Sequence, residues 1–166
     1  MAYATLASFL EEWREESEAT GRYLAALTDR SLGQSVASDH RTLGRIARHL
    51  GETIHEMMPR TGLRLPPAPG PDPRSAASLA GAYAASARAL AEAVASAWTD
   101  ADLDREDDMY GERWKRSRTL RCLVLHQAHH RGQMSVLLRQ AGLRVPGVYG
   151  PAREDWASMG APVPEV

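Results

Sequence analysis

The sequence feature that most constrains the fold is the helical spacing of apolar residues in four segments of about 20 residues each. The clearest segment, residues 39–60, carries an apolar stripe made of Leu43, Ile46, Leu50, Ile54 and Met57. Three further segments with helical patterns cover residues 5–27, 75–98 and 118–141. Few stretches alternate as strands do, so the sequence predicts an all-α protein built as a four-helix bundle.

The ends of these segments carry residues that commonly begin or stop helices. Asp39 is the expected N-cap of the second helix, and Gly142 is the expected residue just past the end of the fourth. The prolines in residues 61–75 cannot continue a helix, so this link is expected to be non-helical. The acidic link 99–117 is longer, and a short extended piece is expected in it near Trp114.

The first helical segment is expected to have a core side and an acidic side. The core side consists of Leu6, Phe9, Leu10, Trp13, Ser17, Tyr23, Leu24 and Leu27. The acidic side, which is expected to face water, consists of Glu11, Glu12, Glu15 and Glu16. This division is typical of a helix at the surface of a bundle.

Length and composition place residues 1–166 in a single domain with a substantial core. Its tail, residues 142–166, contains four prolines, and Tyr149 and Trp156 are expected to pin it to the bundle. A formal net charge of −1 provides no overall field for nucleic acid or an anionic membrane. No apolar run approaches the ~18 residues of a spanning helix, and the N-terminus lacks the regions of a signal peptide. We therefore expect a cytoplasmic protein that binds neither nucleic acid nor membrane.

The most informative motif is "LHQAHHRGQM", which begins at Leu125. At about 100° per residue, His126 and His130 lie on the core face one turn apart, whereas His129 lies at its margin. Two imidazoles at this spacing can converge on one metal ion, as in the helical HExxH motif. Gln127 stands where that motif has glutamate, which excludes the corresponding protease.

A third ligand is expected from the second helix, which contains three histidines. His55 is predicted to point away from the apolar stripe toward solvent, and His40, at the helix start, is predicted to cap the helix or be exposed. His49 flanks the stripe and can face the bundle interior. The predicted metal site is therefore formed by His49, His126 and His130, and three imidazoles leave coordination positions open for water or substrate.

Each of these residues also has a simpler interpretation. The histidines can be hydrogen-bonded core residues without a metal. Cys122, the single cysteine, excludes an intrachain disulfide; it lies one turn before His126 and is either a further ligand or a small core residue. Arg131 is a candidate for holding an anionic substrate group, with a structural ion pair as the alternative. Gln133 is a candidate hydrogen-bonding partner behind the ligands.

At these residues the chain resembles the DinB/YfiT-like superfamily of bacterial four-helix bundles, which is distinct from the polymerase that shares the name. The resemblance rests on "TLGRIARHLGETIHEM" in the second helix and "HQAHHRGQM" in the fourth. It continues into "LLRQAGLRVPGVYGP", where the last helix runs into a Val-Pro and Tyr-Gly-Pro ending. The helical layout agrees as well, so the resemblance covers nearly the whole chain.

The resemblance implies an up-down-down-up bundle, often a homodimer, with a divalent metal bound by one histidine of the second helix and two of the last. Carried onto this sequence, those ligands are His49, His126 and His130. Where activity is known, such relatives are metal-dependent transferases or isomerases that use low-molecular-weight thiols such as bacillithiol, mycothiol or glutathione.

The functional hypothesis is therefore a thiol S-transferase acting on a small-molecule electrophile. Zn²⁺ or Ni²⁺ suits the imidazole ligands and would lower the pKa of a coordinated thiol. Arg131 and Gln133 are the candidate catalytic residues beside the metal. One alternative is a non-enzymatic metal-binding or ligand-sensing bundle. Another is a metal-dependent hydrolase, for which Glu52 or Glu56 would have to approach the histidines as a base.

Overall fold

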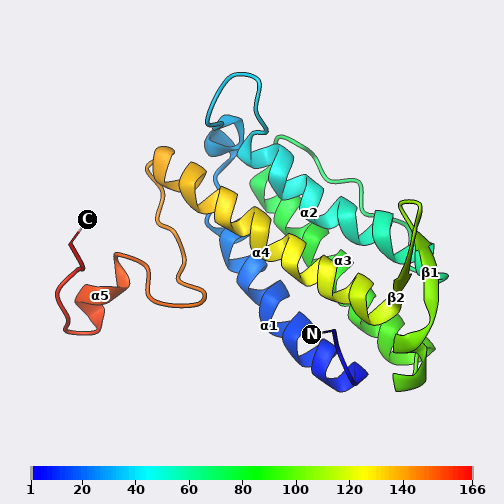
Figure 1. Ribbon diagram of the computed structural model, residues 1–166. Coiled ribbons are helices and arrows are strands. Elements are labelled where there is room, and N and C mark those ends of the chain that lie inside the picture. Colours follow the sequence, from blue (N-terminus) through cyan, green and yellow to red (C-terminus); the bar gives the residue numbers. More distant parts are fainter. Residues whose placement is uncertain (1, 166) are drawn as a thin grey trace.

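A computed structural model describes residues 2–165 and contains four long helices (Figure 1). These are α1 (Leu6–Ala25), α2 (Leu43–Met57), α3 (Ala76–Ala97) and α4 (Arg116–Gln140). The predicted four-helix bundle is confirmed, and the largest change in a helix end is the later start of α2. No helix in the described range is both long and apolar enough to cross a membrane.

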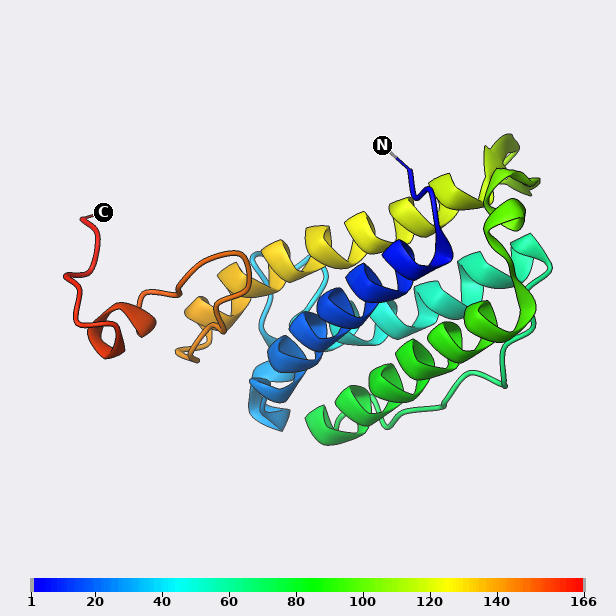
Figure 2. The ribbon, with the colours of Figure 1, turned by 90° about the horizontal axis from the view of Figure 1, so that it is seen from below.

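The helices run up, down, down and up, as the family resemblance implied (Figure 2). Helices α1 and α2 are diagonal to each other, because each packs extensively against both α3 and α4. Since α2 and α3 run in the same direction, residues 62–75 return along the outside of the bundle to connect them. The proline-rich link predicted from the sequence thus spans much of the length of the molecule.

Local capping explains where the helices begin and end. Serine or threonine side chains accept a backbone hydrogen bond at the start of three helices: Thr5, Thr42 and Ser75. The predicted cap Asp39 is wrong, because its carboxylate instead lies 2.7 Å from the ring of His40. The amide of Leu43 donates to the carbonyl of Gln34 at 2.8 Å, which keeps the preceding segment non-helical. Gly142 follows α4 with a φ of 74°, the left-handed conformation expected there.

A small hairpin covers one end of the bundle before α4 begins. Strands β1 (Glu106–Met109) and β2 (Glu112–Lys115) pair antiparallel. Tyr110 and Gly111 connect them with φ values of 60° and 84°, as a two-residue hairpin turn requires. The extended piece expected near Trp114 is therefore confirmed as β2.

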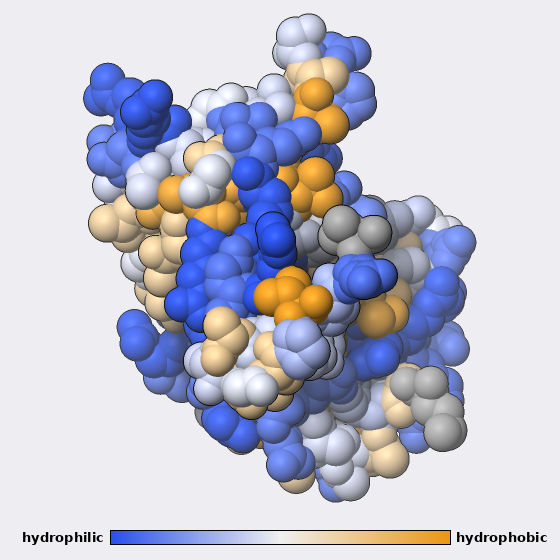
Figure 3. Space-filling model, turned by 90° about the vertical axis from the view of Figure 1, so that its left-hand side faces the viewer, coloured by the Kyte–Doolittle hydropathy of each residue, from blue (hydrophilic) through white to orange (hydrophobic). Residues whose placement is uncertain are grey.

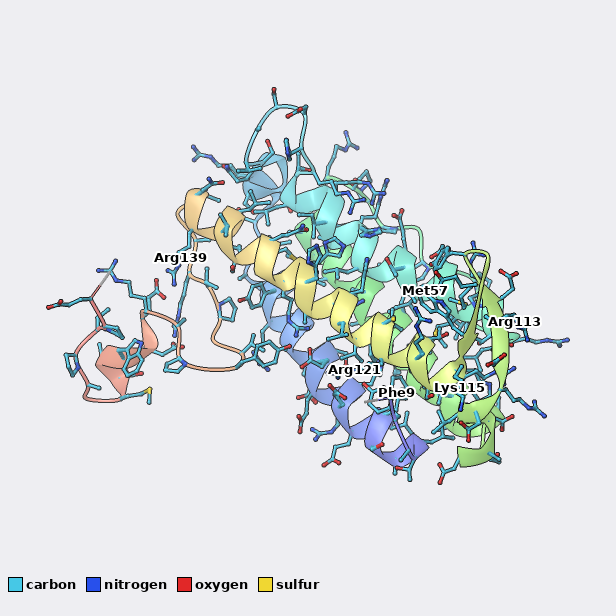
Figure 4. All side chains as sticks on the ribbon, viewed as in Figure 1. Phe9, Met57, Arg113, Lys115, Arg121 and Arg139 are labelled. Carbon is cyan, nitrogen blue, oxygen red and sulfur yellow. The ribbon has the colours of Figure 1, made fainter. Side chains whose placement is uncertain are left out.

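The C-terminal tail leaves the bundle and contains a short helix that the sequence did not predict, α5 (Asp155–Ser158) (Figure 1). Arg139 projects from the end of α4 and forms an ion pair with Glu154 of the tail (Figure 4). Tyr149 pins the tail as expected, because its hydroxyl donates to the carboxylate of Glu16. The same expectation for Trp156 is wrong, since this ring is not among the described side chains that pack on the core.

The core fills the space between the four helices. Its largest fully buried side chains include Phe9, Trp13, Leu43, Leu50, Ile54, Leu90, Met109 and Leu120. Glu16 also lies inside, with an exposed fraction of 8%, so its predicted place on the solvent side of α1 is wrong. Its carboxylate pairs with Arg131 of α4, which makes the burial of this charge possible.

Candidate metal centre

Helices α2 and α4 pack side by side and carry three histidines on their facing sides. His49 stands between Ile46 and Leu50, whose burial fixes the orientation of α2. His126 and His130 are one turn apart on α4, so their rings project in the same direction. We call His49, His126 and His130 the histidine triad, and the structure brings together the same three residues that the sequence selected.

The Nε2 atoms of the histidine triad converge on one point. The Nε2 atom of His126 lies 3.2 Å from that of His49 and 3.1 Å from that of His130. The three ligand atoms all lie within 4.8 Å of one another. Tetrahedral zinc with Zn–N bonds of about 2.0–2.1 Å separates its nitrogen ligands by about 3.3 Å. The spacing therefore fits three imidazole ligands of a single ion.

Gln133 determines which nitrogen of His130 carries the proton. The side-chain oxygen of Gln133 lies 2.7 Å from Nδ1 of His130, and an amide oxygen can only accept a hydrogen bond. Nδ1 therefore donates, which leaves the lone pair of Nε2 directed at the other two rings. This is the orientation that a metal ligand needs, and it matches the contact expected of Gln133.

Hydrogen bonds among the three rings cannot satisfy all the nitrogen atoms that converge in the triad. His126 Nε2 is the partner in both short contacts, and one imidazole N–H cannot serve both neighbours well. Nδ1 of His126 is buried without a hydrogen-bond partner among residues 2–165. An ion bound by the Nε2 atoms would satisfy their converging lone pairs, whereas Nδ1 of His126, on the other side of the ring, would stay without a partner.

Burial keeps the triad neutral at pH 7. The pKa of His49 and of His126 is lowered to about 4, mainly by burial and in smaller part by the neighbouring rings and Arg41. Burial also lowers the pKa of His130, although its hydrogen bond with Gln133 opposes this change. Neutral imidazole is the form that binds metal, so protons do not compete with an ion near neutral pH.

Arg131 does not lie with the triad. The residue is 2% exposed, and its guanidinium donates to the carboxylate of Glu16, to the hydroxyl of Tyr149 and to Oγ1 of Thr20, the last at 2.8 Å. One residue after His130, it is rotated by about 100° around the helix, toward α1. The structure therefore supports a structural ion pair for Arg131 and not the holding of an anionic substrate group.

The other candidate ligands and bases lie apart from the triad. Cys122 is half-buried and is not part of the ligand group. Glu52 is paired with Arg45 and Arg48, each at 3.0 Å. Glu56 is likewise engaged, by Arg60 and by the hydroxyl of Tyr110. Neither glutamate therefore has its carboxylate free beside the histidines.

The three remaining histidines divide into two groups. His129 and His40 are exposed, as expected for His129 at the margin of α4 and for His40 before α2. His55 was predicted to face solvent, and this is wrong. Its ring is half-buried against α3, with Nε2 at 3.0 Å from Oγ of Ser86.

Two charged residues that contact or influence α4 histidines or Arg131 lie outside the set of site residues predicted from the sequence. Arg41 precedes α2, and its charge contributes to lowering the pKa of all three triad histidines. No spacing rule indicates it, because it lies outside the helix. Glu16 follows Trp13 by three residues and precedes Tyr23 by seven, so helical spacing alone could have placed it on the buried side.

Comparison with known proteins places the chain among relatives with this architecture. It is 42% identical to the uncharacterized protein YrdA of Bacillus subtilis (strain 168), over 99% of both chains. A crystal structure of a DinB-like protein from Bacillus cereus ATCC 10987 superposes with a TM-score of 0.85 and 45% identity, covering 89% of this chain and 99% of the other.

A more distant structure supports the fold alone. The DinB-like protein YjoA of Bacillus subtilis has a TM-score of 0.68 at 13% identity, covering 85% of this chain and 97% of its own. The sequence model of the DinB family matches residues 1–165. With its helical bundle and its cluster of three histidines that could bind a metal, this chain belongs to the DinB family.

Proposed function

We propose that this DinB-family protein binds one divalent metal ion, Zn²⁺ or Ni²⁺, through the histidine triad and acts as a low-molecular-weight-thiol S-transferase on small electrophiles. The observation that carries the proposal is the convergence of three Nε2 atoms at the spacing of metal ligands. The thiol class is supported by the resemblance of the histidine motif and the Tyr-Gly-Pro ending to DinB/YfiT-like relatives. The small-molecule substrate and the homodimer stay predictions.

The triad and Gln133 would have different roles at the metal. The triad provides three neutral ligands, and no cysteine or carboxylate of the described residues joins them. Three protein ligands leave a position for substrate, as catalytic sites do and closed structural sites do not. The chemistry that a bound divalent ion supplies is a lowered pKa for a coordinated thiol. Gln133 holds the ring of His130 in the tautomer that presents Nε2.

The two alternatives make different demands on the site. A hydrolase needs a base beside the triad, and the arginine partners of Glu52 and Glu56 disfavour this role. A non-enzymatic metal-binding or ligand-sensing bundle would use the same triad, and it predicts metal-dependent stability without thiol transfer.

The first experiment measures metal content by inductively coupled plasma mass spectrometry on untagged protein. We expect about one ion per chain in the wild type and in the exposed control His129→Ala. We expect almost none in His49→Ala, His126→Ala and His130→Ala. Metal retained in all three triad variants, or none in the reconstituted wild type, would exclude the site.

The second experiment tests the reaction with metal-loaded protein. Conjugation of monochlorobimane is followed by fluorescence with glutathione, bacillithiol and mycothiol in turn. We expect turnover with at least one thiol, and loss of that turnover in His130→Ala but not in His129→Ala. Metal binding without turnover for any thiol would favour the non-enzymatic bundle.

A further inference from the structure

A hollow of about 490 Å³ lies in the α2–α4 groove beside the triad, toward the start of α2. It is lined by Val36, Asp39, His40, Arg41, Ile46, Gln133, Val136 and Leu137. Gln133 connects the hollow to the triad, because the same side chain accepts a hydrogen bond from His130. A hollow of this volume is in the range of sites for small organic molecules.

Arg41 is the cation of this hollow, and its charge is not neutralised. No carboxylate of residues 2–165 lies within ion-pair distance of its guanidinium, whereas Arg45 and Arg48 both pair with Glu52. The acidic residue in the hollow, Asp39, is already engaged with the ring of His40 at 2.7 Å. A guanidinium without a partner at the edge of a hollow is suited to bind a carboxylate through two parallel hydrogen bonds.

The rest of the lining is largely apolar. Val36 and Val136 are unusually exposed for their type, at 60% and 53%, and they come from the loop before α2 and from α4. Ile46 and Leu137 are buried beneath them. Apolar patches lie among hydrophilic ones on the face of the molecule from which the C-terminal tail projects (Figure 3). A concave site with apolar walls and a few polar groups is typical of binding sites for small molecules, and the lining has this composition.

We propose that this hollow binds an organic carboxylate with an apolar body, whose carboxylate is held by Arg41 and whose other end points toward the histidine triad. The proposal rests on the proposed function, since it assigns a ligand class to the same site. It deepens that function by identifying Arg41, rather than Arg131, as the residue that receives the anionic group. Arg131 is not available for this role, because Glu16 already neutralises it.

The test uses 4-phenylbutyrate as the probe and 4-phenylbutyramide as its neutral counterpart. Isothermal titration calorimetry is performed on the wild type, Arg41→Gln and Arg88→Gln, each with and without metal. Arg88 is a matched control: it is exposed, lacks an ion pair in the described part of the chain, and lines a hollow of about 480 Å³ between α1 and α3.

We expect 4-phenylbutyrate to bind the wild type and Arg88→Gln equally, and Arg41→Gln about tenfold more weakly, as the loss of a charge-assisted hydrogen bond implies. We expect the amide to bind the wild type about as weakly as the acid binds Arg41→Gln. Equal binding of the acid by all three proteins, or equal binding of acid and amide, would overturn the proposal.

The two proposals fail in different ways in this experiment. Metal content is measured on the same samples, and absence of metal from the wild type would remove the proposed function. The Arg41 dependence is still measured on the metal-free protein, where the probe cannot coordinate an ion. Normal metal binding with no effect of Arg41→Gln would remove only the proposal for the hollow.

Discussion

Helix α4 carries two polar clusters on consecutive residues, and they differ in whether opposite charges meet in them. His130 belongs to the histidine triad between α2 and α4. Arg131 belongs to what we call the ion-pair cluster between α1 and α4, which consists of Arg131, Glu16, Thr20 and Tyr149.

In the ion-pair cluster, full charges are buried and each meets a partner. The carboxylate of Glu16 receives hydrogen bonds from Arg131 and Tyr149, and the backbone carbonyl of Glu16 receives another from Arg131 at 3.0 Å. In the triad, neutral nitrogen atoms face one another with too few protons between them. The difference teaches that the first cluster pairs its buried charges within the folded chain and joins α1 to α4, although Nε of Arg131 has no partner among residues 2–165. The second cluster instead presents converging lone pairs that a bound ion would satisfy.

The largest effect on stability is expected from Glu16→Ala, which leaves Arg131 buried without its partner. We expect the free energy of unfolding to fall by about 3–5 kcal/mol, measured by urea denaturation. The control Glu15→Ala removes an exposed carboxylate from the same helix and should change it by less than about 0.5 kcal/mol. The folded fraction of Glu16→Ala should still bind one metal ion. Loss of metal without loss of stability would mean that the ion-pair cluster serves metal binding and not the stability of the bundle.

The triad should respond to chelation, and the ion-pair cluster should not. When free metal exceeds its dissociation constant by about 100-fold, binding adds about 2.7 kcal/mol to the free energy of unfolding. We expect a chelator to remove this amount from the wild type and to leave His130→Ala unchanged in thermal and urea unfolding. An equal response of the two proteins would contradict metal binding by the triad.

Gln133→Ala should weaken metal binding without weakening the fold. Its oxygen orients the ring of His130, and loss of such a partner typically costs about 10- to 100-fold in metal affinity. Competition with a fluorescent chelator measures this affinity. Gln140→Ala, an exposed glutamine at the end of the same helix, is the control. Unchanged affinity in Gln133→Ala would mean that the triad is oriented without it.

The smallest effect is expected from Tyr149→Phe, which removes the hydroxyl that joins the tail to Glu16 and Arg131. The loss of this bonding should cost about 1 kcal/mol in urea denaturation, because the Glu16–Arg131 pair remains. Metal content should not change. A loss as large as that of Glu16→Ala would show that the tail, rather than the ion pair, holds this side of the bundle together.

The bundle and the triad were predictable because both depend on spacing within single helices. Two histidines four residues apart must share a helix face, and His49 beside Leu50 must lie near the core of its own helix. The helix packing then needed only to bring the two faces together. The link 61–75 was recognised for the same reason, since proline acts locally.

The errors concern residues whose environment is set by distant parts of the chain. Glu16 was assigned to solvent on account of its charge, although its partner Arg131 lies 115 residues away and makes burial acceptable. His55 was assigned to solvent from one apolar stripe, but α2 has two packed neighbours, and the second of them supplies Ser86. Asp39 is a chemically reasonable N-cap, but the helix begins later, with Thr42 as its cap. The amide of Leu43 donates to the carbonyl of Gln34 and so does not extend the helix back to Asp39.

The diagonal placement of α1 and α2 has a consequence for how the protein folds. Every extensive contact between long helices joins one helix of the first half of the chain with one of the second, so neither half contains a helix pair that could be stable alone. Folding must therefore bring helices of both halves together before any extensive helix pair forms. The triad draws His49 from the first half and the other two histidines from the second, so binding of metal would report that α2 and α4 have come together.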